Sequence, residues 1–285
     1  MITVRAPAKL NLYLRVVGKR ADGYHEIETL FERIDLADEL TFEARPRELS
    51  LTSTDPRLSC GEDNLVLKAA RLLQAESGTP RGACIHLVKR IPIAAGLGGG
   101  SSDAAATLRG LNTLWGLQLD PPRLAQLAAR LGSDVPFFLS AAPFAVGRGR
   151  GERCEPLDES LPLAHVLVVP EERLSTREVY ASAQIDLTAS KPSITMVAHA
   201  LRNGSLGELA HGLWNDLAPE AIRRCPVIAT IQTSLRERGC LGTLVSGSGA
   251  SVFGLCADAA HAQGVAAGMR RGAAGSWRIE IVQTA

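Results

Sequence analysis

The spacing of apolar and polar residues changes several times along the chain, and each change predicts a different element. Residues Ile2 to Val17 alternate apolar and polar side chains, with many β-branched and aromatic residues. Because Pro7 interrupts this run early, it predicts two short strands or one bent strand. After a turn at Asp22-Gly23, the same alternation predicts a strand from Tyr24 to Ile34 and a separate one over Leu40 to Ala44.

Helical spacing alternates with further strands in the rest of the chain. In the first half it predicts helices over 64–76, 104–115 and 121–131 and a strand over 83–88. In the second half it predicts strands over 165–170, 243–256 (with a turn inside) and 277–282, and helices over 194–202, 206–213, 228–235 and 259–269. The pattern therefore indicates two layers of strands and helices of unequal size. A composition shift after the basic segment 144–156 predicts a domain boundary near residue 160.

The stretch Pro92 to Leu108 carries four glycines that run into two serines and an alanine-rich helix. Ser101 or Ser102 suits the N-cap of that helix. A strand, a glycine loop and a helix N-terminus in this order form a cradle of backbone N–H groups for an anion, most plausibly a phosphate. An ordinary flexible loop is the alternative. Neither the Walker loop nor the dinucleotide fingerprint fits the spacing, since serines follow Gly100 directly.

Several polar residues stand in apolar surroundings and are candidates for chemistry. Lys9 and Asn11 share one face of the first strand, because side chains two residues apart point the same way. Asp134 lies between Gly132, which ends the predicted helix, and a Pro-Phe-Phe segment. It is either a helix cap or a partly buried carboxylate. A buried carboxylate needs a cation, and Lys9 would supply one. Tyr24 and His25 are either ordinary strand residues or a platform for a planar base.

Three other segments have two interpretations each. The turn Ser246 to Gly249 is a tight hairpin or a second backbone-lined loop that closes on the first. Thr176, with Ser175, is a helix cap if it has no contact with substrate. The arginines between Arg148 and Arg153 form a solvated hairpin tip, or a lid that adds positive charge near phosphates.

Composition narrows the class of protein. The 285 residues are 46% hydrophobic and 21% charged, which is typical of a globular protein with a substantial core. A formal net charge of +1 gives no reason to expect nucleic acid or a membrane surface as partner. The six cysteines form no CxxC pair and no metal-ligand spacing, so we expect reduced thiols and no metal site. Without a signal sequence or a long apolar run, a cytoplasmic protein is expected.

The motifs resemble those of the GHMP kinases, the superfamily of galactokinase, homoserine kinase, mevalonate kinase and phosphomevalonate kinase. Its glycine loop is similar to residues 92–106 and its C-terminal glycine motif to residues 246–251. The segments Ala6 to Val16, Asp22 to Phe31, Leu131 to Leu139 and Leu244 to Leu255 resemble, in order, the branch that acts on 4-(cytidine 5′-diphospho)-2-C-methyl-D-erythritol. Together they span nearly the whole chain. Ala94 and Ala95 stand where some members carry glycine.

The resemblance implies an α+β fold with a ribosomal-protein-S5-domain-2-like N-terminal domain (residues 1–160) and a ferredoxin-like C-terminal domain (residues 161–285). It implies ATP, brought in with Mg²⁺, as phosphate donor, small-molecule substrates only, and a monomer or weak homodimer. Lys9 and Asp134 would be catalytic. The ATP-binding residues would be Pro92, Ile93, Ala94, Ala95, Gly96, Leu97, Gly98, Gly99, Gly100, Ser101 and Ser102, and the substrate-binding residues Asn11, Tyr24, His25, Phe31, Thr176 and Tyr180. A homoserine or mevalonate kinase, and a silent nucleotide-binding module, are the alternatives.

Overall fold

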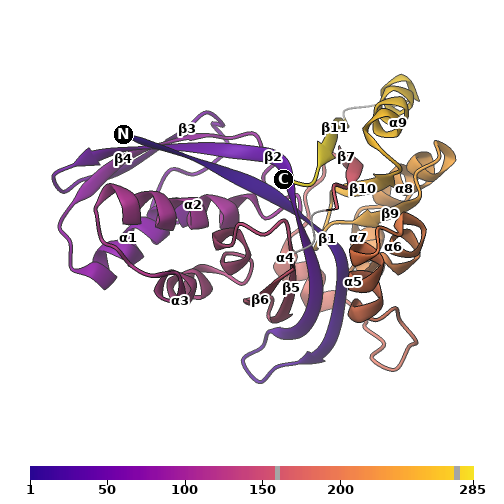
Figure 1. Cartoon of the computed structure of the whole chain (residues 1–285). Helices are drawn as coiled ribbons and strands as arrows, with labels where there is room; N and C mark the ends of the chain where they lie inside the picture. The colour runs from indigo at the N-terminus through magenta and orange to yellow at the C-terminus, as the bar shows by residue number, and fades with distance from the viewer. Residues whose placement is uncertain (158–160, 273–276) are drawn as a thin grey trace.

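The protein has two lobes, each built on one sheet (Figure 1). The structure, a computed structural model, describes residues 1–157, 161–272 and 277–285. The N-terminal lobe lies to the left in Figure 1 and the C-terminal lobe to the right, and the two longest strands run from one towards the other. The predicted boundary between residues 160 and 161 falls beside residues 158–160, outside the described residues, and stays a prediction.

The N-terminal lobe is built on a seven-stranded sheet. Its strands run in the order β3-β4-β2-β1-β8, with β5 paired to β2 and β6 to β5. The strands are β1 (Ile2–Lys19), β2 (His25–Arg45), β3 (Leu49–Ser53), β4 (Gly82–Val88), β5 (Phe144–Gly149), β6 (Arg153–Leu157) and β8 (Trp214–Asn215). Because β8 comes from the second half of the chain and pairs in parallel with β1, the sheet joins both halves.

Helices cover one face of this sheet (Figure 1). They are α1 (Leu65–Ser77), α2 (Gly99–Leu114), α3 (Pro121–Leu131) and the short 3₁₀ helix η1 (Pro136–Leu139). Asn64 caps α1, whose chain leaves through Gly78 in the left-handed region, and Asp120 caps α3. The apolar stripes of these helices and the facing strand residues form one core, which includes Phe42, Leu108 and Phe137.

The C-terminal lobe is a four-stranded antiparallel sheet in the order β11-β7-β10-β9. The strands are β7 (Ala164–Val169), β9 (Gly242–Val245), β10 (Val252–Cys256) and β11 (Arg278–Gln283), and the helices are α4 (Thr176–Ser182), α5 (Ile194–Arg202), α6 (Leu206–Gly212), α7 (Ala218–Arg224), α8 (Val227–Glu237) and α9 (Ala259–Gly272). With α8 before β9 and α9 before β11, this strand order is that of a ferredoxin-like sheet. The predicted α+β fold is confirmed.

The two lobes share a hydrophobic core. Leu10 and Leu12 of β1 pack in one cluster with Leu167 of β7, Val197 of α5 and Phe253 of β10. Polar contacts also connect the lobes: Nε2 of the fully buried His165 lies 2.8 Å from Oε2 of the fully buried Glu32, and the Thr284 hydroxyl donates to Glu32 Oε1 over 2.7 Å. The lobes therefore pack on each other through buried surface.

Some sequence-based expectations are wrong in detail. The first strand is a single one with register shifts at Pro7/Ala8 and Asn11/Tyr13, so of the two predicted forms the single bent strand is confirmed. The two strands predicted over 24–34 and 40–44 are one continuous strand, β2. Strands β3 and β8 and helix α7 were not predicted, because each is short and gives little periodic signal. The six cysteines are all free thiols, as expected.

Candidate active site

Lys9 and Asp134 meet beside the glycine loop (residues 92–98). Lys9 lies on β1 and is 3% exposed, and its Nζ is 3.8 Å from Asp134 Oδ2. Asp134 follows the end of α3, and its side chain is about one third exposed, so one carboxylate oxygen can meet a ligand while the other faces the lysine. The structure therefore brings these two residues close together, while their catalytic role stays a prediction.

Two acceptors fix the direction of the Lys9 ammonium. It donates to Gly96 O over 2.8 Å and to Asn11 Oδ1, whose Nδ2 in turn donates to Thr29 Oγ1 over 2.8 Å. Burial lowers the pKa of Lys9 below its usual value, and the Asp134 carboxylate partly opposes the shift. Both ends of the Asn11 amide are thus engaged within the protein, so the structure gives this residue the task of orienting Lys9.

The carbonyl groups of the glycine loop point into the protein. Lys9 N donates to Leu97 O over 3.0 Å, and Ser251 N donates to Ala95 O over 3.3 Å. Gly96 O accepts from both Lys9 and the Ser246 hydroxyl. Ala94 adopts φ +56°, a left-handed conformation that glycine takes without strain, which explains why glycine suits this position.

Helix α2 starts one turn earlier than predicted. Its N-cap is Gly98, with φ +69° and no capping side chain, so the predicted cap at Ser101 or Ser102 is wrong. Since the first N–H groups of a helix have no intrahelical acceptor, those of Gly99, Gly100 and Ser101 are available to an anion. Ser102 lies inside the first turn, buried, with its hydroxyl unpartnered within the described residues.

The predicted turn at residues 246–249 closes on the glycine loop. It connects β9 to β10 as a tight hairpin, and its Ser246 hydroxyl reaches Gly96 O over 3.0 Å. The turn is therefore both a tight hairpin and a loop that closes on the glycine loop. Asn215 of β8 organises this turn, because its Nδ2 donates to Val245 O over 2.8 Å and to Gly247 O over 2.7 Å. Sequence reasoning missed Asn215, since its role arises only from the tertiary fold.

An aromatic pair, His25 and Tyr180, lies within electrostatic reach of Asp134. The His25 ring at the start of β2 lies 5.2 Å from the Tyr180 ring of α4, tilted by 32°. Burial raises the pKa of Tyr180, and the Asp134 carboxylate adds to the shift, which places the phenol in the field of the candidate base. Tyr24 is half exposed, and the Arg150 guanidinium lies 4.9 Å above its ring.

Two other residues predicted to bind substrate, Phe31 and Thr176, make contacts with other side chains of the protein. Phe31 is 1% exposed and stacks on Phe137 with the ring centroids 4.9 Å apart, so it offers no free face to a base. Lys9 Nζ lies 5.9 Å from the centroid of the Phe31 ring. Thr176 opens α4, and its hydroxyl is 2.8 Å from that of Ser248, while Ser175 acts as the helix cap.

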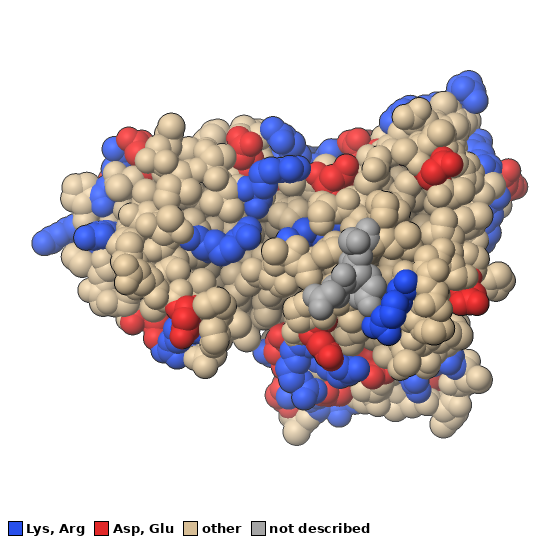
Figure 2. All heavy atoms as spheres, in the orientation of Figure 1, with Lys and Arg blue, Asp and Glu red and all other residues tan. Residues whose placement is uncertain are grey.

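The arginine segment is a hairpin tip whose charges are paired. Arg148 donates to Glu155 over 3.1 Å, and Arg153 to Glu26 over 3.0 Å. Red and blue atoms lie next to one another in the lower middle of Figure 2, over the region that holds the β1–β2 hairpin and strands β5 and β6 in Figure 1. Paired surface charges of this kind favour the solvated-tip interpretation over a basic lid. The tip still approaches the site, since a Cβ atom on Gly151 would lie 3.7 Å from Asp134 Oδ1.

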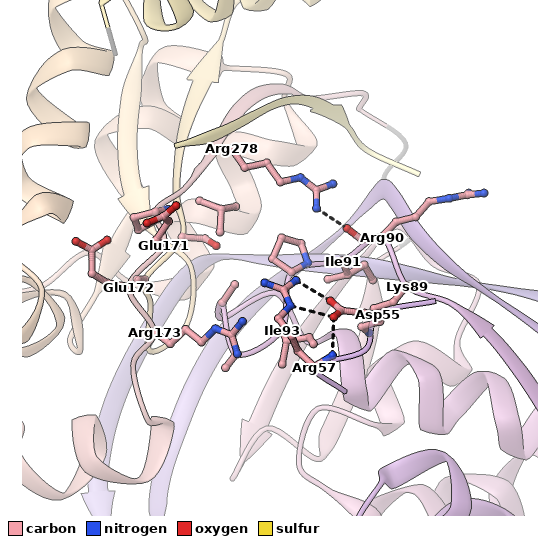
Figure 3. A pocket seen from close by; sticks show the side chains of 17 residues that line it. Asp55, Arg57, Lys89, Arg90, Ile91, Ile93, Glu171, Glu172, Arg173 and Arg278 are labelled. Atoms are coloured by element: carbon pink, nitrogen blue, oxygen red, sulfur yellow. Dashed lines mark hydrogen bonds and ion pairs between the residues drawn. The ribbon is translucent and has the colours of Figure 1, made fainter. Parts of the chain in front are cut away.

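A cavity of about 410 Å³ lies against the glycine loop (Figure 3). Loop residues 92–95 form one wall, and residues 171–173 and 250–251 of the C-terminal lobe form another. Arg57 forms a two-pronged ion pair with Asp55 at its edge, and Arg278 donates to the Arg90 carbonyl. The cavity therefore lies between the lobes, next to the candidate phosphate cradle.

Behind the glycine loop lie three buried charges. Lys89 Nζ donates to Asp38 Oδ2 over 2.5 Å and to Asp103 Oδ2 over 2.7 Å, and all three side chains are at most 4% exposed. Burial raises the pKa of the Asp103 carboxyl to about 7; the Lys89 ammonium opposes this shift and the Asp38 carboxylate adds to it.

This raised pKa predicts a pH dependence of stability. The folded protein holds the Asp103 proton up to about pH 7, whereas an unfolded chain releases it near pH 4. The free energy of unfolding therefore falls as the pH rises through that window. Asp103→Asn mimics the protonated form, so we expect it to match the wild type at pH 4 and to exceed it by about 1–3 kcal/mol at pH 8. Urea unfolding of both proteins measures this, and a difference that does not vary with pH would contradict it.

Comparisons with known proteins agree with this architecture. Residues 64–142 match the GHMP kinases N terminal domain, and residues 197–274 match the GHMP kinases C terminal domain. The 4-diphosphocytidyl-2-C-methyl-D-erythritol kinase of Pelotomaculum thermopropionicum is 46% identical over 95% of this chain and 94% of its own length. The kinase of the same name from Enterococcus faecalis is 39% identical over 94% and 95%.

Solved structures give the same result. A crystal structure of 4-(cytidine 5′-diphospho)-2C-methyl-D-erythritol kinase superposes with a TM-score of 0.82 and 37% identity, covering 99% of each chain. Leishmania major mevalonate kinase shares only the fold, with a TM-score of 0.76 at 16% identity over 100% of this chain and 96% of its own. Within the described ranges, no helix is long and apolar enough to cross a membrane, and no cluster of three acidic, histidine or cysteine side chains could hold a metal ion. With two GHMP domains and relatives of this identity along nearly its whole length, the chain belongs to the 4-diphosphocytidyl-2-C-methyl-D-erythritol kinase family of GHMP kinases and is an ATP-dependent phosphotransferase.

Proposed function

We propose that this enzyme transfers the γ-phosphate of ATP to the 2-hydroxyl of 4-(cytidine 5′-diphospho)-2-C-methyl-D-erythritol, a step of the non-mevalonate (MEP) route to isoprenoid precursors. The observation that supports the proposal is that Lys9 of the Lys9–Asp134 pair bonds to the glycine loop, while the charge of Asp134 acts on Tyr180, which contacts His25. The activity named for the relatives supports the same substrate.

In this proposal ATP occupies the cavity next to the glycine loop. Its phosphates meet the N–H groups of Gly99, Gly100 and Ser101 at the start of α2, where the helix dipole favours negative charge. Residues 92–95 line the cavity and hold the rest of the nucleotide. Mg²⁺ arrives with the nucleotide and neutralises part of its charge.

Asp134 is the proposed general base. Its carboxylate takes the proton of the 2-hydroxyl as the new bond forms between that oxygen and the γ-phosphorus, while the bond to the ADP oxygen breaks. Lys9 holds the carboxylate in place and offsets the negative charge that develops on the transferring group. The buried acceptors Gly96 O and Asn11 Oδ1 keep the ammonium aimed at this point.

In the proposed complex the cytidine end of the substrate contacts the aromatic residues of the site. His25 and Tyr180 form a tilted pair that can pack on and hydrogen-bond a cytosine ring, and the half-exposed Tyr24 stands next to them in sequence. Thr176 contributes through its contact with Ser248, and Asn11 contributes by orienting Lys9. In this scheme Phe31 supports Lys9 from the core.

A coupled ADP-release assay tests the proposal. With Mg²⁺ and ATP, we expect turnover of the cytidylated methylerythritol and none of homoserine or mevalonate, because those acceptors leave the aromatic pair unoccupied. ADP release with either of the smaller alcohols would overturn the substrate assignment but keep the phosphate cradle. Without turnover of any acceptor, the chain would be a silent nucleotide-binding module.

A further inference from the structure

Lys89, Asp38 and Asp103 take no part in the proposed chemistry, although buried charges are costly to maintain. They connect three elements: Asp38 lies on β2, Lys89 directly follows β4, and Asp103 lies on α2. The glycine loop begins and ends among these elements. We propose that the three residues, here named the charge clamp, position the glycine loop and the start of α2 for the nucleotide phosphates. The inference rests on the proposed use of this loop for ATP.

Asp38 fixes the start of the loop. One of its oxygens, Oδ1, accepts from the N–H groups of Arg90 and Ile91 over 2.6 and 2.8 Å. Its other oxygen accepts from Lys89 Nζ. Since Lys89 N also donates to Thr54 Oγ1 over 2.9 Å, the chain entering the loop is held on both sides. These hydrogen bonds therefore fix the position of the backbone directly before Pro92, the first residue of the loop.

Asp103 fixes the other end. It lies four residues beyond Gly99, the first residue of α2, and accepts from the same ammonium that Asp38 binds. A Cβ atom on Gly99 would lie 3.1 Å from Lys89 Nζ, so the ammonium lies directly behind the first helical residue. The clamp thus sets the position of the α2 N–H groups relative to the strand that delivers the loop.

The clamp is asymmetric, which identifies the residue to test. The Asp38 carboxylate accepts three hydrogen bonds, whereas the Asp103 carboxylate accepts one, from Lys89 to Oδ2, and Asp103 Oδ1 has no partner among the described residues. Truncating Asp103 therefore breaks the tie to α2 and leaves the Lys89–Asp38 pair intact. A displaced helix start weakens several N–H contacts to phosphate at once, because positioning errors of about 1 Å already reduce binding and catalysis strongly.

Three variants separate positioning from general stability. Asp103→Ala removes the tie, and we expect the KM for ATP and the Kd for Mg·ADP to rise about tenfold, since hydrogen bonds to charged groups are among the stronger ones. The KM for the acceptor alcohol and kcat should stay within threefold. Asp103→Asn keeps an oxygen that can accept from Lys89, so we expect nucleotide affinity within twofold of the wild type.

Asp120→Ala is the matched control. It also replaces an aspartate by alanine at a helix, and it removes the N-cap of α3, so it lowers Tm. Its nucleotide affinity should not change. Isothermal titration with Mg·ADP gives the affinities without any acceptor, next to Tm values for each variant.

Two outcomes would overturn the clamp: nucleotide affinity of Asp103→Ala within twofold of the wild type despite a lowered Tm, or equal losses in Asp103→Ala and Asp103→Asn. Normal binding of Mg·ADP by a wild-type protein that does not phosphorylate the cytidylated alcohol would overturn only the proposed substrate. Absence of Mg·ADP binding by the wild type would overturn both proposals.

Discussion

Asp134→Asn is expected to lower kcat by about 10³-fold while the protein still binds ATP, because an amide cannot take the hydroxyl proton and general bases contribute factors of this size. The change keeps the shape of the side chain and removes only its charge. The Lys9 ammonium then loses the carboxylate 3.8 Å away but keeps its bonds to Gly96 O and Asn11 Oδ1, so the fold should persist.

The measurement is steady-state ADP release together with the Kd of Mg·ADP. Lys9→Ala should give a loss of the same order, since the proposed mechanism needs the cation as well as the base. Asp120→Asn is the control: this exposed N-cap residue can be replaced by asparagine, an equally good cap, and should leave kcat unchanged. Normal turnover in Asp134→Asn or Lys9→Ala would disprove the assigned mechanism.

Gly96→Ala is expected to lower kcat/KM for ATP by about 10²-fold, the effect of displacing reacting groups by roughly 1 Å. A Cβ atom on Gly96 would lie 2.1 Å from the backbone oxygen of Ser246, so one of the two loops must move. Neither can move freely. Gly96 O accepts from Lys9 and from the Ser246 hydroxyl, and the second loop is held by Asn215.

Gly204→Ala separates the effect of this clash from backbone strain. Gly204 adopts φ +69°, close to the +77° of Gly96, but no atom lies within 4 Å of the position of its Cβ. Both variants therefore carry a similar cost of about 1–2 kcal/mol for an alanine in the left-handed region. Only Gly96→Ala should lose activity beyond that destabilisation. Equal kcat/KM values for the two variants would show that the contact between the loops is unimportant for ATP.

The sequence predicted which two charged residues meet better than it predicted the contacts that hold them in place. Lys9 and Asp134 could be paired because a carboxylate in an apolar segment needs a cation, and the structure brings them together. The predicted gap in β2 arose because Asp38 interrupts the apolar alternation. Its carboxylate points inward to Lys89 and to the chain entering the glycine loop, so the strand continues through a buried polar residue.

Other errors have the same origin in tertiary contacts. Ser101 looked like a helix cap, but Gly98 can take the left-handed conformation from which α2 starts directly. The resemblance implied that Phe31 binds substrate; Phe137 stacks on its ring, a contact that the sequence did not indicate, and the role of Phe31 stays a prediction. Asn215 orders the second loop from a strand of two residues, which no local periodicity indicates.

The core shared by the lobes determines how the molecule unfolds and opens. Leu10 and Leu12 belong to the first sheet but pack against Leu167 and Phe253 of the second, so separating the lobes exposes apolar surface that only the partner lobe covers. We therefore expect the two lobes to melt as one cooperative unit. For the same reason, a hinge-like separation of the lobes would expose this apolar surface to water.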